Sequence, residues 1–349
     1  MMFSAKCRAL AAASAVVLSL GLVVGLVAVA PAAPAQAAAK VKVVKRTASV
    51  KYAVAGHPRG VTVKVTKPVL SAGATAKIRS VFNSKINLVI NKEVAAVKKL
   101  VAGKAKSVGG AVTVQTKAAS VYQGRYVSVA LDIWRNWTGN TSACRDRIVT
   151  YTYDTKTGRF LTLRSFADTN HNQLFWELMS DVADRYSDSD FNTSWWSPAR
   201  YGDNNVFVEA DYPNSLPKYW TVSAAGLTFW SARGDLLDTC SVGPVGFRIS
   251  WNRILTPAAA KGTAKTYRVP FYICEVGARN GSATVKVTGK RVQVSGGYWG
   301  VRGTGGTGDW ALVYSTSVEG STMYRNVMSV DFASRAANAK PTGVFYPCT

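Results

Sequence analysis

Alternation of apolar and polar residues is clearest between residues 219 and 253 of this 349-residue chain. Two strand patterns lie there: 220–230, in which Trp220 and Val222 alternate with Thr221 and Ser223, and 245–252, which has a clean period of two with one apolar and one polar face. Ala224-Ala225-Gly226 is expected to turn the first run back on itself. The pattern predicts an antiparallel sheet with a 14-residue connection at 231–244.

Upstream of this region, the chain mixes strand patterns with helical ones. Residues 74–101 carry apolar side chains at helical spacing with Lys and Asn opposite, so a helix is predicted there, ended by Gly103. A second helix is expected at about 171–186. Strands are predicted at 60–65, 111–118, 120–134, 147–153 and 160–163. Asp154 to Gly158 has the composition of a hairpin turn in which Gly158 takes a positive φ.

Residues 265–349 differ, because they are rich in Gly, Thr, Val and aromatic side chains in short alternating runs. We therefore predict an α+β fold, an antiparallel sheet with packed helices, followed by a small all-β C-terminal module. The expected organisation has five parts: a signal peptide at 1–37, a basic tail at 38–59, an α+β domain at 60–256, a linker at 257–264 and the all-β module at 265–349.

The first 37 residues have the pattern of a secretory signal peptide. Lys6 and Arg8 precede an uncharged apolar run at 9–30, and Ala35-Gln36-Ala37 fits a cleavage site. The run is also long enough for an uncleaved membrane anchor, so that alternative stays open. Cleavage would give a secreted chain without a transmembrane helix in its mature part, located outside the cell or at the cell wall.

Charge is distributed unevenly along the chain. Removal of residues 1–37 leaves 41 basic and 19 acidic residues, a net charge of +22. Residues 40–117 hold 17 Lys and Arg but a single acid, Glu93. Such an excess favours contact with a polyanion, and for a secreted protein a wall polymer or an anionic lipid surface is a more natural partner than nucleic acid. The alternative is a solvated face that only keeps the protein soluble.

Four cysteines remain after export, namely Cys144, Cys240, Cys274 and Cys348. An even number in an exported chain implies two disulfides, with three connectivities open. Cys274 and Cys348 stand at the two ends of the all-β module, so a bridge between them would close it.

Few residues suit catalysis, metal binding or cofactor binding. The chain has two histidines, His57 and His171, which restricts triads and His-rich metal sites. Asp168, Asn170 and Asn172 imitate half of a calcium loop but lack its central Gly and its Glu, so helix capping explains them better. The Gly-rich run 296–308 lacks the Gly-Lys-Ser/Thr of a phosphate loop. We expect no catalytic residue, no metal and no cofactor.

One candidate ligand site lies in that Gly-rich region. Tyr298, Trp299, Arg302 and Trp310 could form a flat platform for a sugar ring or an anionic glycan. The alternative is that these aromatic side chains fill the core of a small β domain.

The ordered motifs of 61–255 resemble the RsiV-like extracytoplasmic domain, a family that includes a lysozyme-sensing anti-sigma factor ectodomain and secreted immunogenic antigens. The resemblance rests on Trp220 to Phe229, Gly234 to Leu237 and Gly243 to Ile249, preceded by the 150–163 hairpin and Phe166-Ala167-Asp168.

That family often carries a Gly-Gly-Ala/Thr-His sequence before the hairpin. Here Asn140 to Cys144 stands in its place, without the histidine. The resemblance implies an α+β domain without established catalysis, and a disulfide between Cys144 and Cys240.

These observations predict a secreted, non-enzymatic binding or cell-envelope protein that contacts an anionic wall polymer, a glycan or another secreted protein. Two alternatives stay open. One is a sensor or inhibitor of a lysozyme-type enzyme. The other is a wall-glycan hydrolase, which would need two carboxylates roughly 5–9.5 Å apart in a cleft. The candidate carboxylates for it are Asp132, Asp146, Glu177, Asp211 and Asp235.

Overall fold

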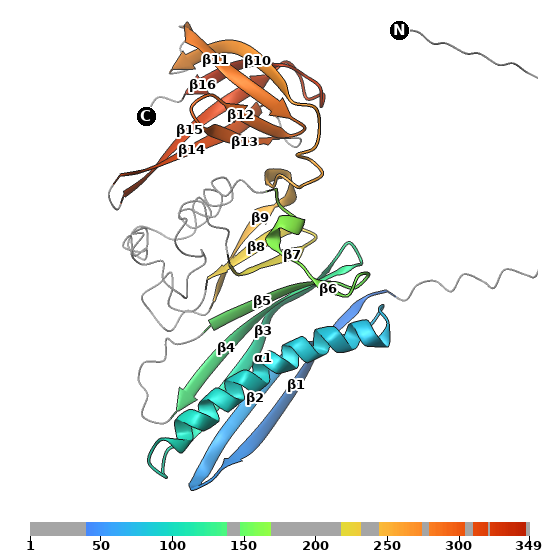
Figure 1. Ribbon diagram of the computed structural model, residues 1–349, viewed down its shortest axis with the longest axis vertical. Coiled ribbons are helices and arrows are strands. Elements are labelled where there is room, and N and C mark those ends of the chain that lie inside the picture. The colour runs from blue at the N-terminus through green and yellow to red at the C-terminus, as the bar shows by residue number, and fades with distance from the viewer. Residues whose placement is uncertain are drawn as a thin grey trace, which may run out of the picture. The chain divides into compact units, whose positions relative to one another are not determined.

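The computed structural model describes residues 40–137, 147–168, 218–231, 244–273, 279–303, 310–319 and 322–346, and its strands form three sheets (Figure 1). The first sheet has six strands in the order β1-β2-β3-β4-β5-β6. Their bounds are β1 Lys42–Val54, β2 His57–Ala72, β3 Gly110–Tyr122, β4 Tyr126–Trp137, β5 Arg147–Asp154 and β6 Arg159–Phe160. Strands β2 and β3 are parallel, and the other neighbours are antiparallel.

Helix α1 (Ala76–Ala102) connects the two parallel strands and covers one face of this sheet (Figure 1). Thr75 caps it, because its hydroxyl accepts a hydrogen bond from the Ile78 backbone N–H at 3.3 Å. Gly103 ends it, with its N–H bonded to the Lys99 carbonyl at 3.3 Å. The helical face at Phe82, Ile86 and Val97 packs against valines of β2, β3 and β4, forming the main core.

A three-stranded sheet packs on the face of the first sheet opposite α1. It contains β7 (Trp220–Ser223), β8 (Gly226–Ser231) and β9 (Val245–Ser250). The free edge of β7 meets hydroxyl groups instead of another strand. Trp220 N–H donates to Thr150 Oγ1 at 3.1 Å, and Val222 N–H donates to Ser128 Oγ at 2.9 Å. These bonds satisfy backbone groups that would otherwise be buried without partners.

The C-terminal module is a closed seven-stranded barrel. Its strands are β10 Lys265–Ile273, β11 Arg279–Thr288, β12 Arg291–Val294, β13 Tyr298–Arg302, β14 Trp310–Glu319, β15 Thr322–Phe332 and β16 Pro341–Tyr346. Strand β16 closes the barrel by pairing antiparallel with β15 and parallel with β10. Val285, Val292, Val313 and Val330 are among the buried residues of the barrel core.

The predicted α+β class, an antiparallel sheet with packed helices, is wrong. The described part of the chain is mostly sheet. Helix α1 is the one α-helix among the described residues, and the second predicted helix lies outside them. The class failed because strand patterns were undercounted: the charged segment assigned to the tail forms β1, and short runs assigned to a small module close into a barrel.

Strand β1 replaces most of the basic tail expected at 38–59. It pairs along its length with β2, for example Thr47 with Thr66 and Val50 with Val63. Lysines on both faces concealed the strand pattern, and such charges are tolerated because β1 is an edge strand of this sheet.

Two predicted turns are confirmed. Gly158 has φ 69° in the turn between β5 and β6, and its N–H donates to the Asp154 carbonyl at 2.8 Å. The turn at Gly226 joins β7 to β8. Among the helices of the described residues, we find none with the length and hydropathy needed to cross a bilayer.

Candidate functional site

The carboxylates of the N-terminal part are withdrawn from its surface. Residues 40–137 and 147–168 contain 23 Lys and Arg but only four acids, Glu93, Asp132, Asp154 and Asp168. Their side chains are 1%, 0%, 3% and 25% exposed, and each lies within ion-pair distance of Lys or Arg. The charges that these described residues expose are therefore mainly those of Lys and Arg.

Glu93 shows how one acid is held inside. It lies on the core-facing side of α1, and its carboxylate forms ion pairs with Arg135 of β4 and Arg147 of β5. A buried carboxylate is costly to ionise without such partners. The two guanidinium groups are about one-third to two-fifths exposed, so their outer edges still face water.

Asp154 holds the β5–β6 turn to the β3–β4 turn. Its carboxylate accepts hydrogen bonds from Arg125 Nε at 2.6 Å, Lys156 N–H at 2.9 Å and Thr157 Oγ1 at 2.8 Å, and the second Arg125 nitrogen Nη2 also donates to it. The Arg125 guanidinium holds the pKa of Asp154 well below its ordinary value, with Thr157 and the Lys156 N–H lowering it further.

The other two acids, Asp132 and Asp168, form ion pairs with residues of other strands. Asp132 on β4 lies 3.5 Å from Lys117 Nζ of β3. Asp168, which follows the 3₁₀ turn Leu163–Ser165, forms an ion pair with Arg291 of β12. Its N–H also donates to the Leu255 carbonyl at 2.5 Å.

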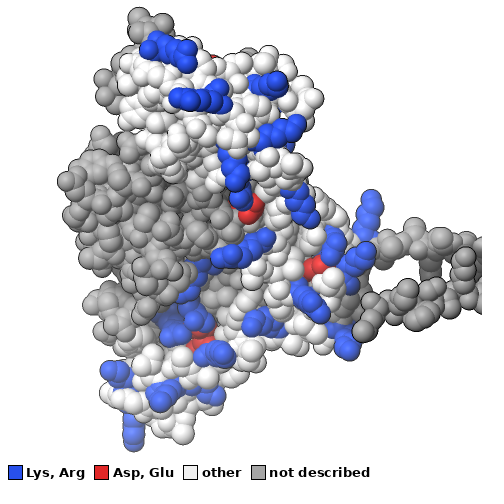
Figure 2. All heavy atoms as spheres, turned by 45° about the horizontal axis from the view of Figure 1, so that its top comes forward, with Lys and Arg blue, Asp and Glu red and all other residues white. Residues whose placement is uncertain are grey.

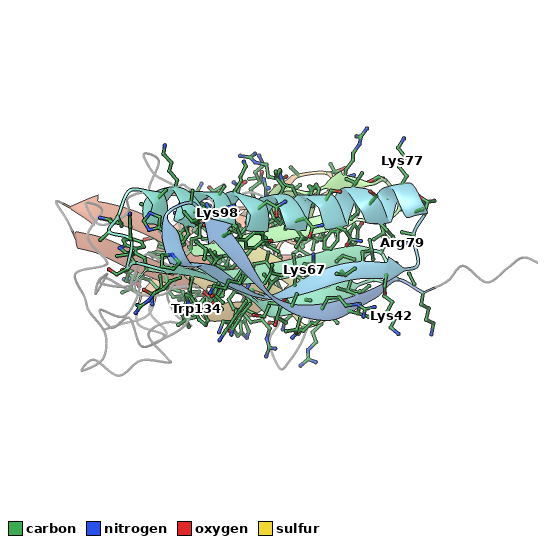
Figure 3. The ribbon with its side chains drawn as sticks, turned by 90° about the horizontal axis from the view of Figure 1, so that it is seen from below. Lys42, Lys67, Lys77, Arg79, Lys98 and Trp134 are labelled. Carbon is green, nitrogen blue, oxygen red and sulfur yellow. The ribbon has the colours of Figure 1, made fainter. Side chains whose placement is uncertain are left out.

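Lysines and arginines occupy the outside instead. On the face drawn in Figure 2, Lys and Arg are spread over the described surface, and Asp and Glu appear at only a few places beside them. On α1, Lys77, Lys92 and Lys99 are exposed. Figure 3 shows Lys77 near the start of the helix and Lys98 further along it.

Some of these cations rest on aromatic rings. The Lys85 ammonium lies 5.4 Å from the Tyr151 ring centre, and the Lys98 ammonium lies 5.5 Å from the Tyr52 ring centre. Such contacts bury the side-chain stems while the charges stay in water. They hold the positive charges close to the protein surface.

The four residues of the predicted sugar platform do not come together. Tyr298 packs on the barrel core, whereas its neighbour Trp299, 3% exposed, packs with Leu255 and Val301 in a separate cluster. Adjacent strand residues point to opposite faces, so these two rings cannot form one surface. Arg302 is also buried.

The Arg302 side chain binds backbone carbonyl groups that follow β15. Its guanidinium lies 4.0 Å from the Phe332 ring centre and donates to the Ser334 and Ala337 carbonyls at 2.6 and 3.2 Å. Trp310 is 43% exposed. Trp299 pairs with Tyr314 of β14, and Trp310 lies four residues from Tyr314 along that strand, a separation of about 13 Å.

Several predicted sites fall outside the described residues. These are the four cysteines, His171, the calcium-like loop beyond Asp168 and the candidate carboxylates other than Asp132. His57 is buried in β2, at 8% exposure. Within the described part of the chain, no group of three or more His, Cys, Asp or Glu is placed to hold a metal ion.

Sequence reasoning missed the pairing of the acids. A signal was present at Glu93, because it continues the apolar positions Ile86, Ile90 and Val97 on one helical face. A single acid on the buried face of a lysine-rich helix indicates an internal cation partner. Which arginines supply that partner could not be read from the local pattern.

The sequence matches no protein-family model and no curated protein. Solved structures that match this chain in a structure comparison include a member of the DUF3298 family from Bacteroides fragilis NCTC 9343, at 11% identity and a TM-score of 0.42, covering 61% of this chain and 92% of that one. They also include a DUF3298 family protein from Pseudomonas aeruginosa PAO1, at 9% identity and a TM-score of 0.36, covering 60% and 91%.

Proposed function

We propose that this chain is an exported, non-enzymatic binding protein of the cell envelope, and that it contacts an anionic wall polymer or glycan through the basic surface of α1 and the six-stranded sheet. The observation that carries this proposal is that every carboxylate in residues 40–137 and 147–168 is paired with Lys or Arg, and that the one acid of α1, Glu93, is buried and paired with arginines while Lys77, Lys92 and Lys99 of the same helix are exposed.

Pairing the acids internally makes the surface charge of this part strongly positive. A polymer with closely spaced negative groups would release counterions on binding, so the affinity should fall steeply as salt rises. Each exposed cation near a dense anionic surface contributes on the order of 1 kcal/mol. Several lysines acting together are enough for binding without a deep pocket.

Membership of the RsiV-like family is part of the proposal and rests on the motif at 220–249. Export rests on the pattern of residues 1–37.

The test compares two triple variants of equal charge change in the purified protein. The first replaces three exposed lysines of α1 by Gln: Lys77, Lys92 and Lys99. The matched control replaces three exposed lysines of the barrel by Gln: Lys265, Lys286 and Lys340. Binding of poly(glycerol phosphate) and of neutral dextran is measured by calorimetry at NaCl concentrations from about 50 to about 500 mM, because the screening of surface charges strengthens over this range.

We expect poly(glycerol phosphate) to bind the wild type in a salt-dependent manner and dextran of similar length to bind much more weakly. The helix variant should lose roughly tenfold or more in affinity at low salt, because three cations are removed from the contact. The barrel variant should lose much less. No binding at any salt contradicts the proposal, and equal losses in both variants contradict its placement on α1.

A further inference from the structure

A groove of about 400 Å³ crosses β1, β2 and β3. It is lined by three consecutive residues of each strand, namely Thr47 to Ser49, Lys64 to Thr66 and Thr113 to Gln115. Val65 and Val114 belong to the core under α1, and no residue of α1 lines the groove. The groove therefore lies on the sheet face that the helix does not cover.

The side chains that enter the groove are the residues on either side of those core positions. They are hydroxyl, amide or ammonium groups: Thr47, Ser49, Lys64, Thr66, Thr113 and Gln115. Ala48 is the exposed apolar residue in the lining. An apolar helix or a lipid chain would find little to contact in such a lining.

Strand register arranges these groups in two rows. One row runs from Thr47 through Thr66 and Gln115 to Asp132, and the hydroxyls of the first two lie 3.2 Å apart. Neighbouring strands are about 4.8 Å apart, so a row from β1 to β4 spans about 14 Å. Polar groups are thus repeated at a regular spacing over the length of a few linked sugar rings.

The second row ends at an aromatic side chain. It runs from Ser49 through Lys64 and Thr113 to Trp134. Trp134 is partly exposed and lies on the side of the sheet away from α1 (Figure 3). The Lys117 ammonium lies 6.0 Å from its ring centre and 3.5 Å from the buried carboxylate of Asp132.

We propose that this groove is a binding site for an acidic polysaccharide, which lies across β1, β2 and β3 with one end beside Trp134. Hydroxyl and amide side chains can both donate to and accept from sugar hydroxyls, and indole rings pack against the apolar faces of sugars. Lys64 and Lys117 match the negative charge of the polysaccharide, and Asp132, the carboxylate at the end of the first row, is fully buried. This inference rests on the proposed function and assigns it a saccharide-specific site.

The test separates sugar recognition from charge. The double variant Thr66→Val and Gln115→Leu removes two hydrogen-bonding side chains without altering the net charge. Both positions are on the sheet surface, and circular dichroism and the melting temperature verify that the variant folds. Binding to polygalacturonate oligosaccharides and to inorganic polyphosphate, which has no sugar, is compared with that of the wild type at one fixed salt concentration.

We expect the double variant to lose at least about tenfold in affinity for polygalacturonate, as expected when two net hydrogen bonds are lost, and to retain its affinity for polyphosphate. Lys64→Gln in the groove should weaken polygalacturonate binding more than Lys92→Gln on α1, although both remove one charge. Unchanged polygalacturonate binding by the double variant overturns the inference. If polyphosphate still binds in that case, the proposed function survives. If the wild type binds neither polygalacturonate nor polyphosphate, the proposed function and the groove site are both overturned.

Discussion

Asp154 gives the sharpest stability test, because a single carboxylate accepts four hydrogen bonds. Asp154→Asn keeps the shape but loses the charge, and it turns an amide N–H₂ toward the donors of Arg125 or Thr157. Hydrogen bonds to a charged group contribute about 1.5–3 kcal/mol each when they are fully buried. The Arg125 side chain is 38% exposed and regains water, so we expect a total loss of about 3 kcal/mol.

The expected change in melting temperature at pH 7 follows from domain size. A domain of 150–250 residues shifts by about 2–4 °C per kcal/mol, so Asp154→Asn should melt roughly 6–12 °C lower than the wild type. Calorimetry is the suitable assay, because the barrel and the six-stranded sheet can unfold in separate transitions.

Acid should remove this difference. The folded protein lowers the pKa of Asp154, so its stabilising contribution is complete above the ordinary carboxyl range and is lost as the pH falls toward the lowered pKa. The gap between wild type and variant should shrink progressively below about pH 5. Other acids titrate equally in both proteins and cancel from the gap.

A matched control is Thr157→Val, which removes one of the four bonds and keeps the charge. It should cost about 1 kcal/mol and retain the pH dependence of the wild type. A gap for Asp154→Asn that is the same at pH 7 and pH 3 would refute the role of the ionised carboxylate.

Two further predictions concern the interior. Glu93→Ala should lower the free energy of unfolding, measured in urea, by about 2–4 kcal/mol. Glu93→Leu should recover most of that loss, because Leu fills a similar volume and Arg135 and Arg147 can turn to water. Equal stability of the Ala variant and the wild type would contradict this prediction. Gly300→Ala should destabilise the barrel by roughly 3 kcal/mol, because the added methyl would lie 1.9 Å from the Leu312 carbonyl oxygen and must part β13 from β14. Faster amide hydrogen exchange confined to the barrel would support it, and unchanged exchange would contradict it.

Local chemistry made several elements predictable from the sequence. The helix at 76–102 has both its apolar face and its ending Gly103 in the sequence. The turn at Gly158 and strand β9 were predicted for the same reason, because turn residues and a period of two act over a few positions.

Non-local pairing explains what the sequence did not predict. Strand β1 is a strand because β2 lies beside it, and its own residues are too charged to indicate this. The interior position of the acids depended in the same way on distant partners, since Arg135 lies 42 residues from Glu93. The candidate ring platform failed because alternation along β13 sends Tyr298 and Trp299 to opposite sides.

Closure of the barrel by β16 has a consequence for the order of folding. The first strand, β10, pairs in parallel with the last, so Phe271 meets Val344 only after almost the whole module has been made. Contacts this far apart in sequence carry a large loop-closure cost and fold slowly. Until Pro341–Tyr346 is in place, β10 and β15 each keep an open edge, so the docking of β16 is also the step that protects the module from pairing with other chains.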